Sequence, residues 1–142
     1  MTEPKYKNLF SPIKINNMMV PNRIIMAPAN GGYSKERATS GAGINIWGCG
    51  SVDLPEAGMM EGMPYMFTKY SYQKTRRILD FMKQGGSKAS LEVMHAGLMR
   101  RGNDNVGPSV QKNPEGYECR ELAEEELFEI AEAFGKTCKD AK

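Results

Sequence analysis

The sequence predicts an α/β fold built on a parallel sheet. Two observations predict it: short apolar runs stand between chain breakers, and segments with helical periodicity follow them in a repeating order. The chain has 142 residues, of which 40% are hydrophobic and 25% charged, as is typical of a single globular domain. We therefore expect one domain over residues 1–142, without an internal linker or repeat.

The first elements expected are a hairpin and a strand. Residues 13–15 alternate between apolar and polar, Asn16-Asn17 tolerates a left-handed turn, and residues 18–20 resume the apolar run. Residues 23–27 form a short apolar run that Pro28 stops. A run of this kind is typical of a strand buried on both faces, as in a parallel sheet.

The remaining elements alternate between helix and strand. We expect a short helix over residues 33–40, a strand over 44–47, a helix over 68–84, a strand over 88–95, a polar loop with several glycines and prolines, and a helix over 121–140. The acidic residues Glu124 to Glu126 open the last helix, where they complement its dipole. The first crossover, residues 30–42, barely reaches the dozen residues that a parallel connection needs, so the first βα unit is short.

Charge and composition exclude several function classes. A net charge of +2 is too small to indicate nucleic acid or a membrane surface as a partner. No apolar run is long enough to cross a membrane and the N-terminus has no apolar leader, so we expect neither a membrane span nor a secretory signal. Cys49, Cys119 and Cys138 are far apart and form no metal-ligand pattern with His95, the single histidine. Free thiols in a cytoplasmic, reducing setting are therefore expected, with Cys49 kept as a candidate site residue.

Several stretches resemble the old yellow enzyme family of FMN-dependent NADH:flavin oxidoreductases, especially the branch with 2,4-dienoyl-CoA reductase and the bile-acid-inducible oxidoreductases. In chain order they are LFSPIKINNMMVPNRIIMAP, YSKERATSGAGINIWG, LEVMHAG, GPS and ELAEEELFEIAEAFGKTCKDAK. The first and third are the most specific pair, and together the stretches span nearly the whole chain. The resemblance implies a TIM (β/α)8 barrel with an N-terminal hairpin at its bottom. A full barrel takes roughly 250 residues, so this chain supplies a partial barrel: the hairpin and about three βα units.

The resemblance also implies a flavin site at the carboxyl ends of the strands. Ala27, Pro28, Ala29 and Asn30 would pack against the flavin, although Pro28 is equally a strand stop. Cys49, between two glycines, falls where the family places a small residue beside the ring system. The alternative without a ligand is that this stretch is only a tight turn.

Glu92 stands where the family usually has a glutamine that hydrogen-bonds the pyrimidine edge of the flavin. An ionised carboxylate only accepts hydrogen bonds, whereas an amide also donates. The alternative for Glu92 is a carboxylate paired with an Arg or Lys of a later strand. His95 is expected to be structural or cofactor-adjacent, because the substrate-orienting histidines of the family belong to the fourth strand. Leu98 replaces an arginine that often follows His-Ala-Gly, with Arg100 and Arg101 close by. We assign no catalytic residue and no metal ligand.

The implied reaction is hydride transfer from NAD(P)H through FMN to an enoyl-type α,β-unsaturated carbonyl compound, with an iron–sulfur cluster only in a longer parent chain. Two alternatives stay open. The chain could be a non-catalytic α/β module that self-associates through an exposed sheet edge, or part of a TIM-barrel enzyme that does not use flavin.

Overall fold

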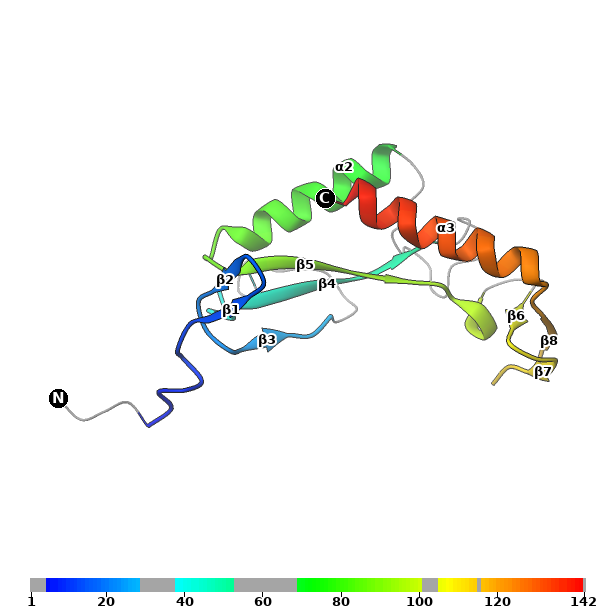
Figure 1. Ribbon diagram of the computed structural model, residues 1–142, viewed down its shortest axis with the longest axis horizontal. Helices are drawn as coiled ribbons and strands as arrows, with labels where there is room; N and C mark the ends of the chain where they lie inside the picture. Colours follow the sequence, from blue (N-terminus) through cyan, green and yellow to red (C-terminus); the bar gives the residue numbers. More distant parts are fainter. Residues whose placement is uncertain (1–4, 29–37, 53–68, 101–104, 115, 142) are drawn as a thin grey trace. The chain divides into compact units, whose positions relative to one another are not determined.

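The computed structural model describes residues 5–28, 38–52, 69–100, 105–114 and 116–141, without the side chains of residues 49 and 69–71. Figure 1 shows the chain coloured along its sequence. The chain divides into two compact units. The first comprises Met1–Gly48 and Thr75–Glu92, and the second comprises Cys49–Lys74 and Val93–Lys142.

The first unit begins with the predicted hairpin. Strands β1 (Ile13–Ile15) and β2 (Met18–Val20) pair antiparallel, and Asn16 has the left-handed φ of 50° that the turn requires. Val20 is only 1% exposed, and its side chain lies against Gly43, immediately before the next strand of the unit's larger sheet. The hairpin therefore covers the amino-terminal end of that strand, as a plug at the barrel bottom would.

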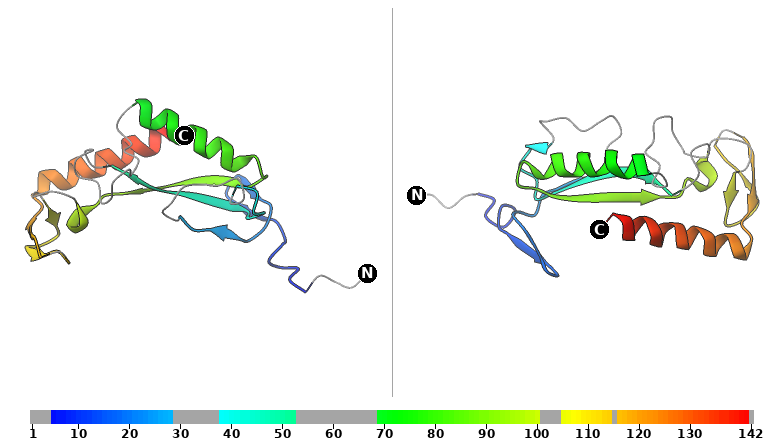
Figure 2. Two further views of the ribbon diagram at one scale, coloured as in Figure 1. Left: turned by 180° about the vertical axis from the view of Figure 1, so that it is seen from behind. Right: turned by 90° about the horizontal axis from the view of Figure 1, so that it is seen from above.

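Three predicted strands form one sheet in the order β3-β4-β5: β3 (Ile25–Met26), β4 (Ile44–Ser51) and β5 (Lys88–Met94). Helix α2 (Lys69–Lys83) connects β4 to β5, and Figures 1 and 2 show its course along one face of these strands. The predicted parallel arrangement is confirmed, while β4 runs beyond the expected end at residue 47. Of the short helix expected over 33–40, residues 33–37 lie outside the described residues.

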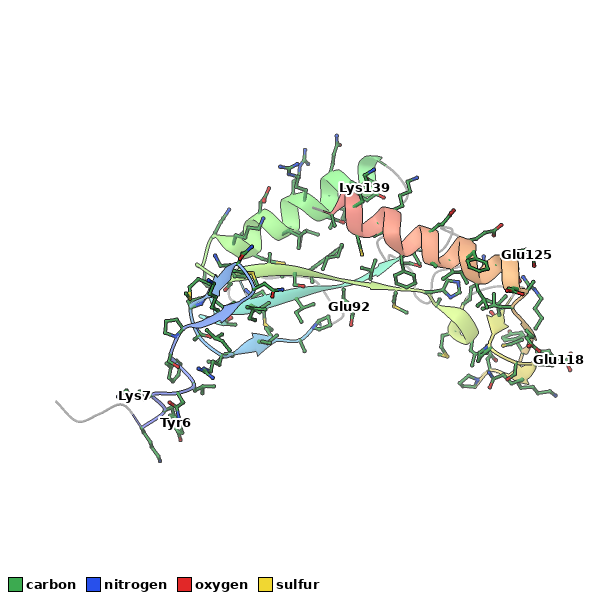
Figure 3. The ribbon with its side chains drawn as sticks, viewed as in Figure 1. Tyr6, Lys7, Glu92, Glu118, Glu125 and Lys139 are labelled. Atoms are coloured by element: carbon green, nitrogen blue, oxygen red, sulfur yellow. The ribbon has the colours of Figure 1, made fainter. Side chains whose placement is uncertain are left out.

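The sheet of the first unit has one covered and one open face. Ile25 pairs with Ile44 and Met26 with Asn45, so neighbouring positions alternate between the faces. Asn45 has no exposed surface, whereas Ile25 is 56% exposed. Glu92 projects from the face opposite to helix α2 (Figure 3). We call this side the open face. The pairing of Ile25 with Ile44 and the alternation along β4 and β5 assign to it Ile25, Ile44, Ile46, Gly48, Ser90 and Glu92, of which Ile44 is buried.

Backbone hydrogen bonds flank the pairing of β4 with β5. The N–H of Lys88 donates to the carbonyl of Gly43, and the N–H of Val52 donates to the carbonyl of Met94.

The second unit contains a small sheet that the sequence did not predict. Residues expected as a polar loop hold a 3-10 turn, η2 (Gly97–Met99), followed by β6 (Val106–Gly107), β7 (Gln111–Lys112) and β8 (Glu118–Glu121). The strand order is β6-β8-β7, parallel for the first pair and antiparallel for the second. Val106 and Cys119 are almost fully buried and supply part of the core of this unit.

Helix α3 (Glu124–Asp140) ends the described chain. It starts later than the predicted residue 121, because β8 occupies the chain up to that position. The acidic first turn is confirmed, and the apolar side chain of Leu127 in the same turn region is 52% exposed. Cys119 and Cys138 carry free thiols, as predicted. No helix in the described part of the chain is long and apolar enough to cross a membrane.

Candidate flavin site

Three residues of the first unit meet near the carboxyl ends of the sheet strands. Pro28 follows β3, Gly48 lies on β4 and Glu92 lies on β5. A Cβ built on Gly48 would lie 2.5 Å from Oε2 of Glu92 and 3.0 Å from Cβ of Pro28. The end of the sheet where barrel enzymes hold their ligands therefore carries a proline, a bare backbone and a carboxylate in direct proximity.

The structure brings only some of the predicted site residues together. It brings Pro28 and Glu92 together, and it leaves Ala27 exposed directly after β3. Ala29 and Asn30 lie outside the described residues, and Cys49 is described only by its place on β4. Gly48, which sequence reasoning treated only as a neighbour of Cys49, is the residue that makes the contact between the strands possible. A glycine pair inside an apolar strand was the signal that pointed to it.

Glu92 is available as a hydrogen-bond acceptor. Its side chain is exposed on the open face, and no ion pair joins it to another described residue. The partnership with an Arg or Lys that was its alternative role is therefore not formed within the described part of the chain. An ionised carboxylate there accepts hydrogen bonds on both oxygens and suits a ligand edge that presents an N–H.

His95 takes part in local structure. Its Nδ1 accepts a hydrogen bond from the N–H of Gly97 at 3.2 Å, and its ring is half-buried. With Nδ1 occupied as an acceptor, a neutral imidazole carries its proton on Nε2. This bond holds the turn after β5, in keeping with the structural role predicted for His95.

The residues that follow His95 serve the small sheet of the second unit. Leu98 lies against Gly107, since a Cβ on this glycine would be 2.8 Å from Cδ2 of the leucine. The amide of Asn113 donates to the carbonyl of Leu98 at 3.3 Å and accepts from the N–H of Tyr117 at 2.9 Å. The pKa of Glu126 is lowered chiefly by its hydrogen bond from Arg120, and the positive charge of Arg100 adds the smallest contribution. Arg101 lies outside the described residues.

Tyr72 is a further perturbed group in the second unit. Burial raises the pKa of its phenol above the usual 10.0, and the nearby carboxylate of Asp140 adds to the rise. These two residues lie on α2 and α3, so they mark a helix–helix contact. Among the described residues, no group of three His, Cys, Asp or Glu side chains could hold a metal ion.

Proteins similar to this chain include two reductases and a probable flavin oxidoreductase. The chain is 31% identical to a metal reductase of Desulforamulus reducens over 94% of this chain and 22% of that protein. It is 29% identical to a cinnamate reductase of Clostridium sporogenes, over 97% and 24% of the two chains. A probable NADH-dependent flavin oxidoreductase of Bacillus subtilis, YqiG, is 27% identical over 97% and 42%. This chain thus spans about a fifth to two fifths of the length of these relatives.

Solved structures of larger enzymes contain the same fold. A 2-naphthoyl-CoA reductase in complex with 2-naphthoyl-CoA matches with a TM-score of 0.82 and 24% identity, over 96% of this chain and 26% of that one. The old yellow enzyme of Trypanosoma cruzi matches with a TM-score of 0.80 and 20% identity, over 97% and 48%. These likenesses confirm the predicted fold class, part of a TIM barrel.

The family model of the NADH:flavin oxidoreductase / NADH oxidase family matches residues 8–142, almost the entire chain. The matched range includes the hairpin, all three strands of the parallel sheet and helix α3. The chain belongs to this family.

Proposed function

We propose that this chain is the N-terminal, flavin-contacting part of an FMN-dependent NAD(P)H oxidoreductase of the ene-reductase type, and that it is inactive by itself. The observation that carries the proposal is the meeting of Pro28, Gly48 and Glu92 at the carboxyl ends of three parallel strands. Membership of the NADH:flavin oxidoreductase / NADH oxidase family supports a flavin cofactor and a nicotinamide reductant. The cinnamate reductase among the relatives supports a small-molecule substrate of enoyl type.

The described residues fit a flavin. A flat ring system needs close approach to backbone, and Gly48 has no side chain on the open face. The pyrimidine edge of the ring presents an N–H, for which the exposed Glu92 is an acceptor. Pro28 is half-buried beside them and adds an apolar surface. Ala27, Ala29, Asn30 and Cys49 complete the residues that we propose around the cofactor.

Bound FMN would supply hydride transfer from NAD(P)H to the β-carbon of the unsaturated carbonyl compound. The part of this chain would be to hold one side of the ring and to set the charge beside its pyrimidine edge. We place the groups that orient the substrate and donate the proton outside these 142 residues, together with any iron–sulfur cluster. The location that we propose for the parent enzyme is the cytoplasm.

The test is the mass and cofactor content of the native polypeptide that carries this N-terminus. Antibodies against an N-terminal peptide would isolate it from extract, and acid release followed by mass spectrometry would identify a bound flavin. We expect a species far above 15.8 kDa that contains FMN. A larger species without flavin would overturn the cofactor assignment, and a flavin-free species at 15.8 kDa would overturn the enzyme proposal.

A second function has one observation in its favour. Exposed apolar side chains occur on the open face and on the hairpin, including Ile25 at 56%, Met19 at 56% and Ile15 at 42%. Parallel sheets that are apolar on both faces are normally covered on both sides. A free chain of this size would therefore be a non-catalytic module that associates with copies of itself, and the flavin-free outcome above would favour it.

A further inference from the structure

The contact between Gly48 and Glu92 depends on the absence of a side chain at Gly48. A Cβ at this position would lie 2.5 Å from Oε2 and 2.7 Å from Cβ of Glu92. Both distances are below the closest approach that real Cβ atoms make, so any other residue would displace the glutamate. Pro28, 3.0 Å away, leaves no room for the new atom on its own side.

The side chain of Glu92 lies against this bare stretch of β4, since its Oε2 and Cβ are the atoms nearest to the Cβ position of Gly48. It stays exposed, and no described residue is paired to its charge.

We propose that Gly48 is a positioning residue, whose missing side chain lets Glu92 lie across β4 and present its carboxylate to the N3–H of a flavin on the open face. The inference rests on the proposed function. It adds a ligand preference: the site should bind a ring whose pyrimidine edge carries an N–H donor more tightly than a ring without one. A ring methylated at N3 offers no donor and brings a methyl group against the carboxylate, whose oxygens then lose their partner.

The test compares two ligands in the native polypeptide that carries this N-terminus: FMN and FMN methylated at N3. Dissociation constants come from quenching of flavin fluorescence. We expect the wild-type protein to prefer FMN by at least tenfold. Gly48→Ala should weaken FMN binding by at least tenfold and bring the ratio of the two constants close to one. Glu92→Gln keeps an acceptor oxygen and should retain the preference, whereas Glu92→Ala should abolish it.

Gly135→Ala is the matched control, because a Cβ at that helical glycine meets nothing within 4 Å. It should leave both constants unchanged. If the wild-type protein binds FMN but binds the methylated ligand equally well, the inference is wrong and the proposed function stands. If it binds neither flavin, the proposed function fails and the ligand assigned to Glu92 fails with it.

A second measurement tests the contact without any ligand. The urea midpoint of unfolding is compared for wild type, Gly48→Ala, Glu92→Gly and the double variant. If Gly48 makes room for Glu92, the loss caused by Gly48→Ala should fall by at least half once Glu92 has no side chain. An equal loss in both backgrounds overturns the positioning role. A Gly48→Ala protein that fails to fold, while the double variant folds, supports it.

Discussion

Arg120 and Glu126 are joined by two parallel hydrogen bonds, each 2.7 Å long. Nη1 of the arginine donates to Oε2 and Nη2 donates to Oε1, and the N–H of Ala123 donates to Oε2 at 2.8 Å. These bonds connect the end of β8 to the first turn of α3. The arginine above all, and then the backbone N–H, lower the pKa of Glu126 to about 2.

The lowered pKa predicts a dependence of stability on acid. Because the folded-state pKa of Glu126 lies below its ordinary 4.5, its contribution is present above pH 4.5 and is lost as the pH falls towards 2. Glu126→Gln should therefore flatten the fall of the guanidinium midpoint between these two pH values. Glu118→Gln is the control, because it removes a carboxylate of strand β8 that is not part of this pair. An unchanged slope in Glu126→Gln would contradict the prediction.

The amide of Asn45 is buried without a hydrogen-bond partner. The residue has no exposed surface, and neither its Nδ2 nor its Oδ1 meets a partner among the described residues. Leaving such groups unpaired costs about 1–3 kcal/mol. Leucine has the same branched shape and number of side-chain heavy atoms, so Asn45→Leu should raise the free energy of unfolding by about that amount. Urea denaturation would measure it.

The amide of Asn113 is paired, unlike that of Asn45, so replacement by leucine should have the opposite effect on stability. Its amide links the turn at Tyr117 to the carbonyl of Leu98 with two hydrogen bonds. Asn113→Leu should lower the free energy of unfolding by about 1–3 kcal/mol, because it leaves these backbone groups unpaired. Loss of stability in both variants would mean that Asn45 has a partner or that its site does not accept leucine.

The hairpin and the three parallel strands could be predicted because their signals are local. Alternation at Ile13–Ile15, the turn at Asn16 and the breaker Pro28 each act within a few residues. The small sheet was missed, because its short strands, such as Val106–Gly107, lie among glycines and prolines that indicate a loop.

The candidate site, too, could be predicted only in part. The place of Glu92 near a strand end follows from the order of the elements, because carboxyl ends of parallel strands share one edge. The role of Gly48 does not follow from that order, since it depends on a contact with a residue on another strand. Local sequence patterns do not encode such a tertiary contact.

Gly85 meets the backbone of another segment in the first unit. A Cβ on this glycine would overlap the carbonyl oxygen of Ala38 and lie 3.0 Å from Cα of Thr39. Because backbone atoms cannot rotate away, Gly85→Ala should lower the free energy of unfolding by about 1–3 kcal/mol. Gly135→Ala, in open space within α3, should raise it by about 0.5–1 kcal/mol. Thermal unfolding of both variants measures the contrast, and equal shifts would refute it.

Ile25 tests whether the open face mediates self-association of the 142-residue chain. It lies on β3, at one edge of the three-stranded sheet, and is 56% exposed. If copies associate there, Ile25→Lys should lower the average mass at high concentration, because an edge lysine opposes strand pairing and desolvation of the face. Light scattering after gel filtration measures the mass. Val110→Lys, at a residue 74% exposed in the second unit, is the control. A wild-type chain that stays at 15.8 kDa at every concentration, or an Ile25→Lys chain that associates as wild type does, would exclude this interface.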